Sequence, residues 1–107
     1  MYKLLGQAAP EDTAAATIIT WPRSDRALTI RSIIVCNVTS SAATCRIFHP
    51  ASTTATYSVA TALFYDVSVQ ANGSTVIELN IELSSDAPYL GVQSGTASAL
   101  TFSVYGG

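Results

Sequence analysis

Charge is scarce in this sequence. Charged residues make up 11% of the 107 residues, against roughly 25% in an ordinary globular domain. The five basic residues are scattered along the chain, at Lys3, Arg23, Arg26, Arg31 and Arg46. Proteins that bind nucleic acid gather their basic residues into a patch or stripe. The sequence therefore predicts no nucleic-acid partner.

Long apolar runs are also missing. No stretch approaches the ~18 residues that a membrane-spanning helix needs. Residues 1–17 hold one lysine and an apolar stretch far shorter than the core of a signal peptide, and Glu11 and Asp12 follow at once. We therefore expect no membrane partner, and we expect synthesis in a host cytoplasm without an encoded export signal.

Metal-binding residue types are few. The sequence has one histidine, His49, and two cysteines, Cys36 and Cys45. A structural zinc site takes four such ligands, so no metal is expected, and no other cofactor is indicated. In a reducing compartment the cysteines are expected to be core thiols. A disulfide remains the alternative if their strands pair.

Catalytic motifs are absent as well. No serine lies in a G-x-S-x-G turn, and no glycine belongs to a phosphate-binding loop that leads into a helix. Glu78 and Glu82 would lie about 13 Å apart along a strand, farther than paired catalytic carboxylates. His49 precedes a proline at a strand end, where a rim position is expected. The sequence predicts a protein that is not an enzyme, with a small hydrolase using His49 as a formal alternative.

Small polar and small apolar residues are abundant instead. Alanine, serine and threonine account for 42 of the 107 residues. Together with many valines and isoleucines, the threonines favour strands over solvated helices. The weakly charged surface suits a protein packed against neighbours, and a soluble sandwich with a plain Ser/Thr surface is the alternative.

Alternating apolar residues and turn residues predict eight short strands. Turn signals every 8–12 residues are typical of an antiparallel β-sandwich or jelly roll, here a single domain over residues 1–107. The predicted strands are Tyr2–Gln7, Thr13–Trp21, Ile30–Asn37, Ala43–Phe48, Leu63–Val69, Ser74–Leu83, Tyr89–Gln93 and Ala99–Tyr105. One or two helical turns are possible within Tyr57–Phe64, where apolar residues recur at helical spacing.

Three of the connections are expected to close hairpins: residues 38–42, the Asn72-Gly73 turn and residues 94–97. Ser74–Leu83 alternates strictly, which predicts one face on the core and one in water. Leu63–Val69 also alternates, with Tyr65 and Val67 expected on one face. Asp66 is expected on the opposite, polar face, where it could pair with an arginine.

The segment Ala27–Phe48 is apolar on both of its predicted faces. If its hairpin pairs Cys36 with Cys45, one face belongs to the core: Ile30, Ile34, Cys36, Cys45 and Ile47. The other face mixes guanidinium groups with large apolar side chains: Arg31, Ile33, Val35, Arg46 and Phe48. Such a mixture is typical of a protein interface, although Arg31 could instead lie over the edge of the sandwich.

Trp21, the sole tryptophan, is a further candidate interface residue. It ends a predicted strand close to Arg23 and Arg26, and tryptophan and arginine are enriched at interface hot spots. A tryptophan that covers the open end of the sandwich is the alternative.

Four segments of the chain together resemble a group of short β-rich virion proteins of tailed bacteriophages. They are YKLLGQAAP (Tyr2–Pro10), SIIVCN (Ser32–Asn37), ATCRIF (Ala43–Phe48) and YDVSVQAN (Tyr65–Asn72). The segments occur in the same order as in that group, although each is short. The chain departs from the group at Cys45 and around Leu63-Phe64. The resemblance implies a structural role in the particle, and it supplies no functional residue to carry over.

These observations predict a capsid decoration (cement) protein on the capsid surface of a tailed phage head. Its partners would be the major capsid protein and further copies of itself, as a dimer or trimer. The alternative is a tail or fibre module that binds a host-surface glycan. That function would need exposed aromatic platforms, for which Trp21, Tyr57 and Tyr89 are the candidates.

Overall fold

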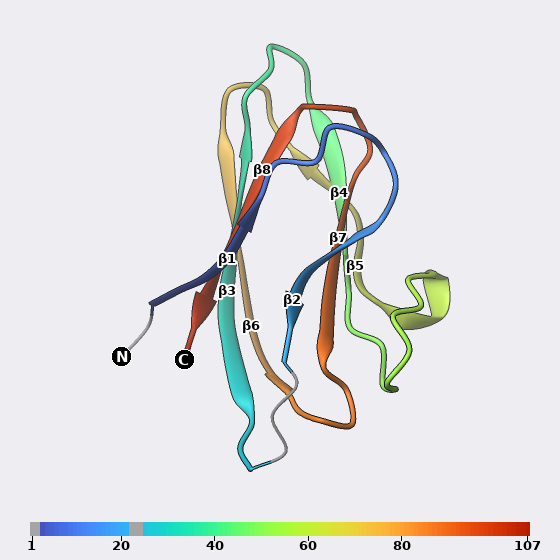
Figure 1. Cartoon of the computed structure of the whole chain (residues 1–107). Helices are drawn as coiled ribbons and strands as arrows, with labels where there is room; N and C mark the ends of the chain where they lie inside the picture. Colours follow the sequence, from blue (N-terminus) through green and yellow to red (C-terminus); the bar gives the residue numbers. More distant parts are fainter. Residues whose placement is uncertain (1–2, 22–24) are drawn as a thin grey trace.

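The computed structural model describes residues 3–21 and 25–107, over which eight strands and one short 3₁₀ helix, η1 (Val59–Thr61), are formed. The strands are β1 (Lys3–Ala8), β2 (Ala16–Thr20), β3 (Leu28–Asn37), β4 (Ala43–Phe48), β5 (Ala62–Val69), β6 (Ser74–Leu83), β7 (Tyr89–Ser94) and β8 (Leu100–Gly106). They form two facing layers (Figure 1). Tyr2 and Arg23, named in the sequence predictions, lie outside the described residues.

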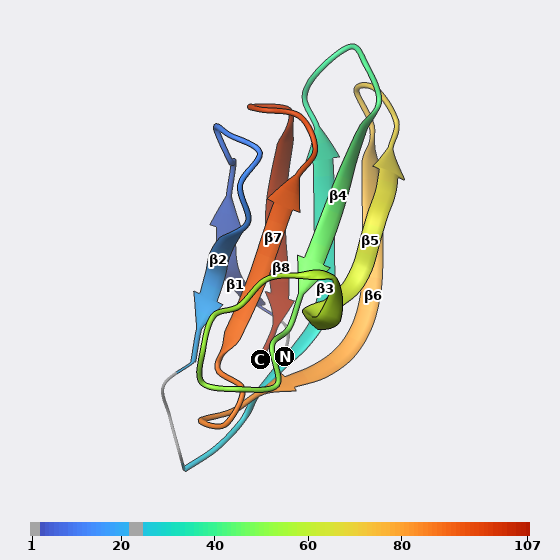
Figure 2. The same cartoon turned by 90° about the vertical axis from the view of Figure 1, so that its right-hand side faces the viewer.

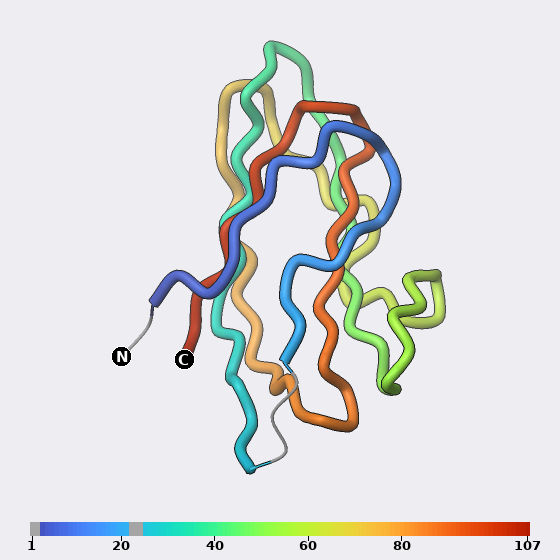
Figure 3. Tube along the Cα trace, viewed as in Figure 1, coloured from blue at the N-terminus to red at the C-terminus, as the bar shows by residue number. Residues whose placement is uncertain are grey.

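The strands pair into two antiparallel sheets, in the orders β1-β8-β3-β6 and β2-β7-β4-β5. Figure 2 shows the second sheet face-on, and Figure 3 traces the chain as it passes between the layers at both ends. Successive strands alternate between the sheets, except that β4 and β5 are neighbours in one sheet. Eight antiparallel strands wound in this way form a jelly roll. The predicted fold class is confirmed.

The three predicted hairpins are wrong, because each of those turns joins strands of different sheets. β3 pairs with β6 and β8, whereas β4 pairs with β5 and β7. The Asn72-Gly73 turn does form, since Asn72 has a φ of 54° and the Gly73 N–H donates to the Gln70 carbonyl at 3.2 Å. A tight turn reverses the chain, but it does not decide which strand becomes the hydrogen-bonded neighbour.

The two faces predicted for Ala27–Phe48 are therefore wrong in part: Ile30, Cys45 and Ile47 lie in the core as predicted, but the faces of β3 beyond Ile30 are exchanged. Ile33 and Val35, predicted at an interface, are fully buried in the core, whereas Ile34 and Cys36 face outward from β3. The register of β3 shifts against both neighbouring strands between Ile30 and Ser32. A register irregularity of this kind changes which side chains point inward beyond it.

The two cysteines are free thiols on different sheets. Cys36 pairs with Thr101 and Ser74, and Cys45 pairs with Val67 and Ser94. The predicted Cys36–Cys45 pairing is wrong, and no disulfide links them. Cys45 is a core thiol, as expected, but Cys36 is half-buried on the outer face of its sheet. Burial raises the pKa of the Cys45 thiol to about 11.

The strict alternation predicted for Ser74–Leu83 is confirmed, and so are its bounds, which are those of β6. Its apolar side chains are buried or pack against the core: Ile77, Leu79, Ile81 and Leu83. Its polar side chains Glu78, Asn80 and Glu82 are exposed.

Asn37 ties the two sheets together at one end of the sandwich. Its side chain is 1% exposed. Nδ2 donates to the carbonyls of Ser41 at 2.9 Å and Val69 at 3.1 Å, while Oδ1 accepts from the N–H and the hydroxyl of Thr39 at 2.9 and 2.7 Å. The Asn37 N–H donates to the Gly73 carbonyl at 2.8 Å. One side chain at the end of β3 therefore fixes both the β3–β4 connection and the end of β5.

Replacing Asn37 with alanine is expected to lower the free energy of unfolding by about 3 kcal/mol, because several partner groups lose a bond inside the protein. Asn80→Ala, on the exposed face of β6, is the matched control and should change stability by less than about 0.5 kcal/mol. Urea denaturation of both variants measures the difference. Equal losses would contradict the assigned role of Asn37.

Burial of Cys45 predicts a pH dependence of stability. Between the ordinary thiol pKa of 9.0 and the folded-state value of about 11, the unfolded state releases a proton that the folded state retains. Stability is therefore fully present below about pH 9, falls as pH rises and levels off above about pH 11. The stability of wild type relative to Cys45→Val should fall by about 2–3 kcal/mol over this range. Val67→Ala is the control because it removes no titrating group. The difference in the free energy of unfolding between wild type and Val67→Ala should not change with pH. Urea denaturation at each pH measures both differences.

Candidate functional site

The outer face of the β2-β7-β4-β5 sheet carries a cluster of polar and aromatic side chains around Arg46. Arg46 lies on β4 and pairs with Gln93 of β7 on one side. On the other side, the register jumps from Cys45–Val67 to Ile47–Phe64. Both Tyr65 and Asp66 of β5 therefore lie opposite Arg46, which is the geometry of a β-bulge.

The bulge places two different contacts on one guanidinium group. Asp66 has a φ of 54°, in the left-handed region that aspartate tolerates better than most residues. Arg46 Nε donates to Asp66 Oδ1 at 2.7 Å, and the guanidinium carbon lies 3.9 Å from the centroid of the Tyr65 ring. The hydrogen bond with Asp66 raises the pKa of Arg46 above its ordinary value, so this side chain stays charged.

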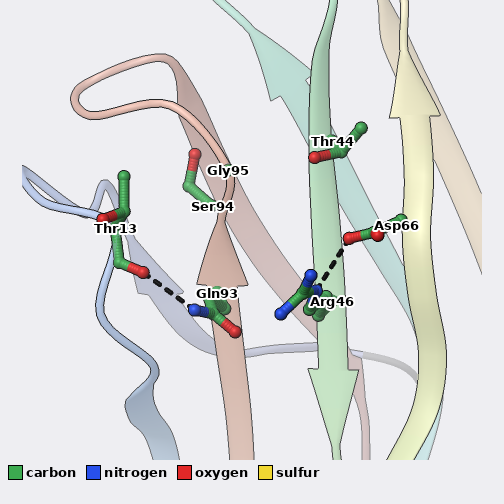
Figure 4. Close-up of a pocket in the computed structure, with 7 residues that line it drawn as sticks. All are labelled: Thr13, Thr44, Arg46, Asp66, Gln93, Ser94 and Gly95. Atoms are coloured by element: carbon green, nitrogen blue, oxygen red, sulfur yellow. Dashed lines mark hydrogen bonds and ion pairs between the residues drawn. The ribbon is translucent and has the colours of Figure 1, made fainter. Parts of the chain in front are cut away.

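An open depression of about 360 Å³ lies beside the contacts of Arg46 with Asp66 and Tyr65 (Figure 4). It is lined by Thr13, Thr44, Arg46, Asp66, Gln93, Ser94 and Gly95. Gln93 is held in place because its Nε2 donates to the Thr13 carbonyl at 2.8 Å. Figure 4 shows Arg46 between Gln93 and Asp66, and the residues around it come from β4, β5, β7 and the β1–β2 connection. The lining offers both hydrogen-bond donors and acceptors.

A second depression of about 420 Å³ adjoins the first and shares Arg46 and Gln93 with it. Its remaining lining is largely apolar and aromatic: Ala15, Phe48, Tyr57, Ser58, Val59 and Tyr65. One wall is the β4–β5 connection, residues 49–61, which lies across the sheet in Figure 2. Of the helical turns predicted within Tyr57–Phe64, the structure forms one short 3₁₀ helix, η1.

Tyr57 anchors that connection to the sheet. Its ring packs on Phe48, with the centroids 5.7 Å apart, and over Gly91 of β7, where a Cβ atom would come within 2.5 Å of the ring. The Tyr57 and Thr17 hydroxyls are 2.5 Å apart. Burial raises the pKa of Tyr57, against the opposing effect of the hydrogen bond with Thr17. A side chain at position 91 would have to displace the Tyr57 ring.

The six predicted interface residues do not form one surface. Ile33 and Val35 lie in the core, and Phe48 is 2% exposed, covered by Tyr57. Arg31 is exposed on the outer face of the other sheet, away from Arg46. Of the six residues, Arg46 and Phe48 line the depressions. The predicted surface depended on a β3–β4 hairpin that does not exist.

Trp21, the sixth residue, lies at the rim of the sandwich. Its ring packs against the core, and Nε1 donates to the Arg26 carbonyl at 3.1 Å. The Arg26 guanidinium lies 5.9 Å from the centroid of the Trp21 ring, and the backbone N–H of Trp21 donates to the Pro88 carbonyl at 2.8 Å. These contacts fit the alternative in which Trp21 covers an open end. His49 also lies at this end, with Nε2 3.3 Å from the Ala87 carbonyl.

Sequence reasoning missed most of the residues around Arg46. The prediction that Asp66 pairs with an arginine is confirmed, and the partner is Arg46. The alternation predicted for Leu63–Val69 is wrong, because Phe64 and Val67 pack inward while Tyr65 is 47% exposed. The sequence did contain a signal for the bulge. Phe64 and Val67 are both apolar but three residues apart, and a regular strand places such residues on opposite faces. A bulge between them brings both onto the core face. Gln93 and Thr13 carried no signal of their own.

Residues 3–21 and 25–107 contain no group of three or more His, Cys, Asp or Glu side chains placed to hold a metal ion. Over the same residues, no helix has the length and apolar character needed to span a bilayer.

No family model matches the chain, and no curated protein matches it. Among solved structures, it is similar to a chain in the "Structure of infectious bursal disease virus Gx strain", with 10% sequence identity and a TM-score of 0.51. The match covers 99% of this chain and 37% of that chain, so this chain spans little more than a third of its length. At this identity the likeness establishes the jelly-roll fold alone. The resemblance to tailed-phage proteins stays a prediction.

The bulge at Asp66 predicts an unusual order of stability among variants. Asp66→Val and Asp66→Asn both remove the ion pair, but a β-branched residue is strained at a positive φ. Asp66→Val should therefore be about 1–2 kcal/mol less stable than Asp66→Asn. Ser68 is exposed farther along β5 and supplies the control: in ordinary strand geometry Ser68→Val should be at least as stable as Ser68→Asn. Thermal denaturation of the four variants tests this, and the same order at both positions would contradict the bulge.

Proposed function

We propose that this chain is a non-enzymatic structural protein of a virus particle, acting as a decoration (cement) protein on a tailed phage head. The observation that carries the proposal is the jelly-roll winding of the chain, whose likeness to a chain in a virus structure covers 99% of its length. Viral capsid domains commonly use this architecture. The tailed-phage assignment rests on the sequence resemblance.

The outer face of the β1-β8-β3-β6 sheet supports this proposal. Two rows of outward side chains cross the sheet: Leu4, Tyr105, Ser32 and Glu78 in one row, and Gln7, Ser103, Ile34 and Val76 in the other. Glu78 is the sole charged member of the two rows. Leu4 and Val76 are 49% and 58% exposed. Arg31 and Glu78 line a depression of about 350 Å³ on the same face. Exposed apolar side chains and arginine are both typical of protein interfaces, so this face suits contact with another protein.

Such a protein would act by adding buried area across neighbouring subunits of the shell. A partner that binds only the assembled state stabilises that state by mass action. The proposed partners are the major capsid protein and sister copies of this chain, in a symmetric dimer or trimer. Of the six residues predicted at an interface, Arg31 is exposed on this face and remains a candidate contact.

The proposal predicts that Val76→Asp weakens attachment to the particle. A carboxylate placed in a buried contact without a partner should lower the number of copies retained on purified particles about tenfold or more. Val59→Asp is the matched control, because Val59 is 74% exposed on the opposite side of the sandwich. Quantitative gels of washed particles give the retained copy number. Equal retention of both variants would refute this interface, and a cryo-EM map that places the protein on the tail alone would refute the decoration role.

A further inference from the structure

We propose that the two depressions on the β2-β7-β4-β5 sheet form one binding groove for a neutral oligosaccharide. The proposal is independent of the structural role, which uses the opposite sheet. The depressions share Arg46 and Gln93 in their lining, so they adjoin along the middle of the sheet. One end of the groove is polar, and the other is walled by Tyr57, Val59 and Tyr65.

The chemistry of the groove matches that of a sugar. A sugar hydroxyl both donates and accepts hydrogen bonds, while the C–H face of its ring packs on aromatic side chains. The polar end offers a guanidinium, a carboxylate, an amide and threonine hydroxyls, which supply both kinds of partner. Arg46 covers one face of the Tyr65 ring, but the residue is still 47% exposed, so the rest of this amphipathic ring is available beside those groups. Binding sites typically combine such an apolar wall with a few fixed polar groups.

The charges in the groove favour a neutral ligand over an anion. Arg46 is the sole cationic residue among the lining side chains of both depressions, and Asp66 already pairs with it at 2.7 Å. A phosphate, sulfate or carboxylate would have to approach the Asp66 carboxylate as well, which costs Coulomb energy. A hydroxyl group meets no such penalty. It can accept from the Arg46 Nη groups, because the bond to Asp66 uses Nε.

The groups that would contact the sugar are held before it arrives. Asp66 sits at a φ of 54° on the bulge, and Arg46 is fixed between that carboxylate and the Tyr65 ring. Gln93 is oriented by its bond to the Thr13 carbonyl, which leaves its Oε1 and its second N–H for a ligand. Preorganisation of this kind reduces the entropy lost on binding. Bulges and strained backbone are also enriched at functional sites.

The test begins with a glycan array of the purified full chain. The array carries neutral glucose, galactose, mannose and N-acetylglucosamine oligomers beside sialylated and sulfated glycans. The neutral oligomer with the strongest signal is then titrated into ¹⁵N-labelled protein up to about 10 mM, which nearly saturates a site with a dissociation constant of about 1 mM. The expected result is a set of saturating amide shifts in β4, β5 and β7. No binding by any neutral oligomer, binding by anionic glycans alone, or shifts on the β1-β8-β3-β6 sheet would overturn the proposal.

Matched variants then separate the groove from the rest of the surface. Gln93→Ala and Tyr65→Ala should each raise the dissociation constant about tenfold or more, as expected when a well-placed contact is lost. Gln7→Ala and Tyr105→Ala make the same changes on the opposite sheet and should stay within about twofold. Arg46→Lys keeps the positive charge but loses the planar fork, so it too should weaken binding about tenfold. The amide spectrum of each free variant verifies its fold, and equal effects on both sheets would overturn the assignment.

Discussion

Every part of this molecule depends on the burial of one face of each sheet against the other. The inner strands β8 and β3 contribute Phe102, Val104, Ile33 and Val35, and all four side chains are fully buried. Full burial of an apolar side chain of this size contributes about 1.5–3 kcal/mol. Since charged residues make up 11% of the sequence, this apolar contact supplies most of the driving force for folding. Except between β4 and β5, each connection leads to the other sheet and places the apolar face of the next strand over that of the previous one.

Two irregularities in strand register, one in β3 and one in β5, determine which side chains lie on the outer faces of the sheets. In β3 the register shifts after Ile30, and Arg31 and Ser32 both lie outside the core. In β5 the bulge directs Tyr65 and Asp66 toward Arg46. A regular strand would have turned one member of each pair into the core, where an arginine or an aspartate without a partner costs several kcal/mol. The bulges therefore let polar residues occur within strands that still pack.

The sequence was sufficient for the strands but not for their partners. The bounds of β4 and β6 were predicted correctly, because alternation and turn residues are local signals. Sheet membership is not local: residues 38–42 can join adjacent strands or cross between layers with the same composition. The error at Ile33 and Val35 followed directly, since their orientation was inferred from a hairpin with Cys45. Asp66 was placed correctly because its polarity, unlike its strand register, could be read without a partner strand.

The contrast between the two outer faces is a consequence of where the long connection lies. β4 and β5 are the consecutive strands that lie in the same sheet. The connection between them, residues 49–61, therefore does not cross to the other sheet. It folds back instead over β7 and β2, where Tyr57 contacts Gly91 and Thr17. That return raises a wall on one face and leaves the other face open. The face proposed to contact the shell and the hollowed face around Arg46 then lie on opposite sides of one small domain, so contact with a shell through the first would leave the second exposed to a soluble ligand.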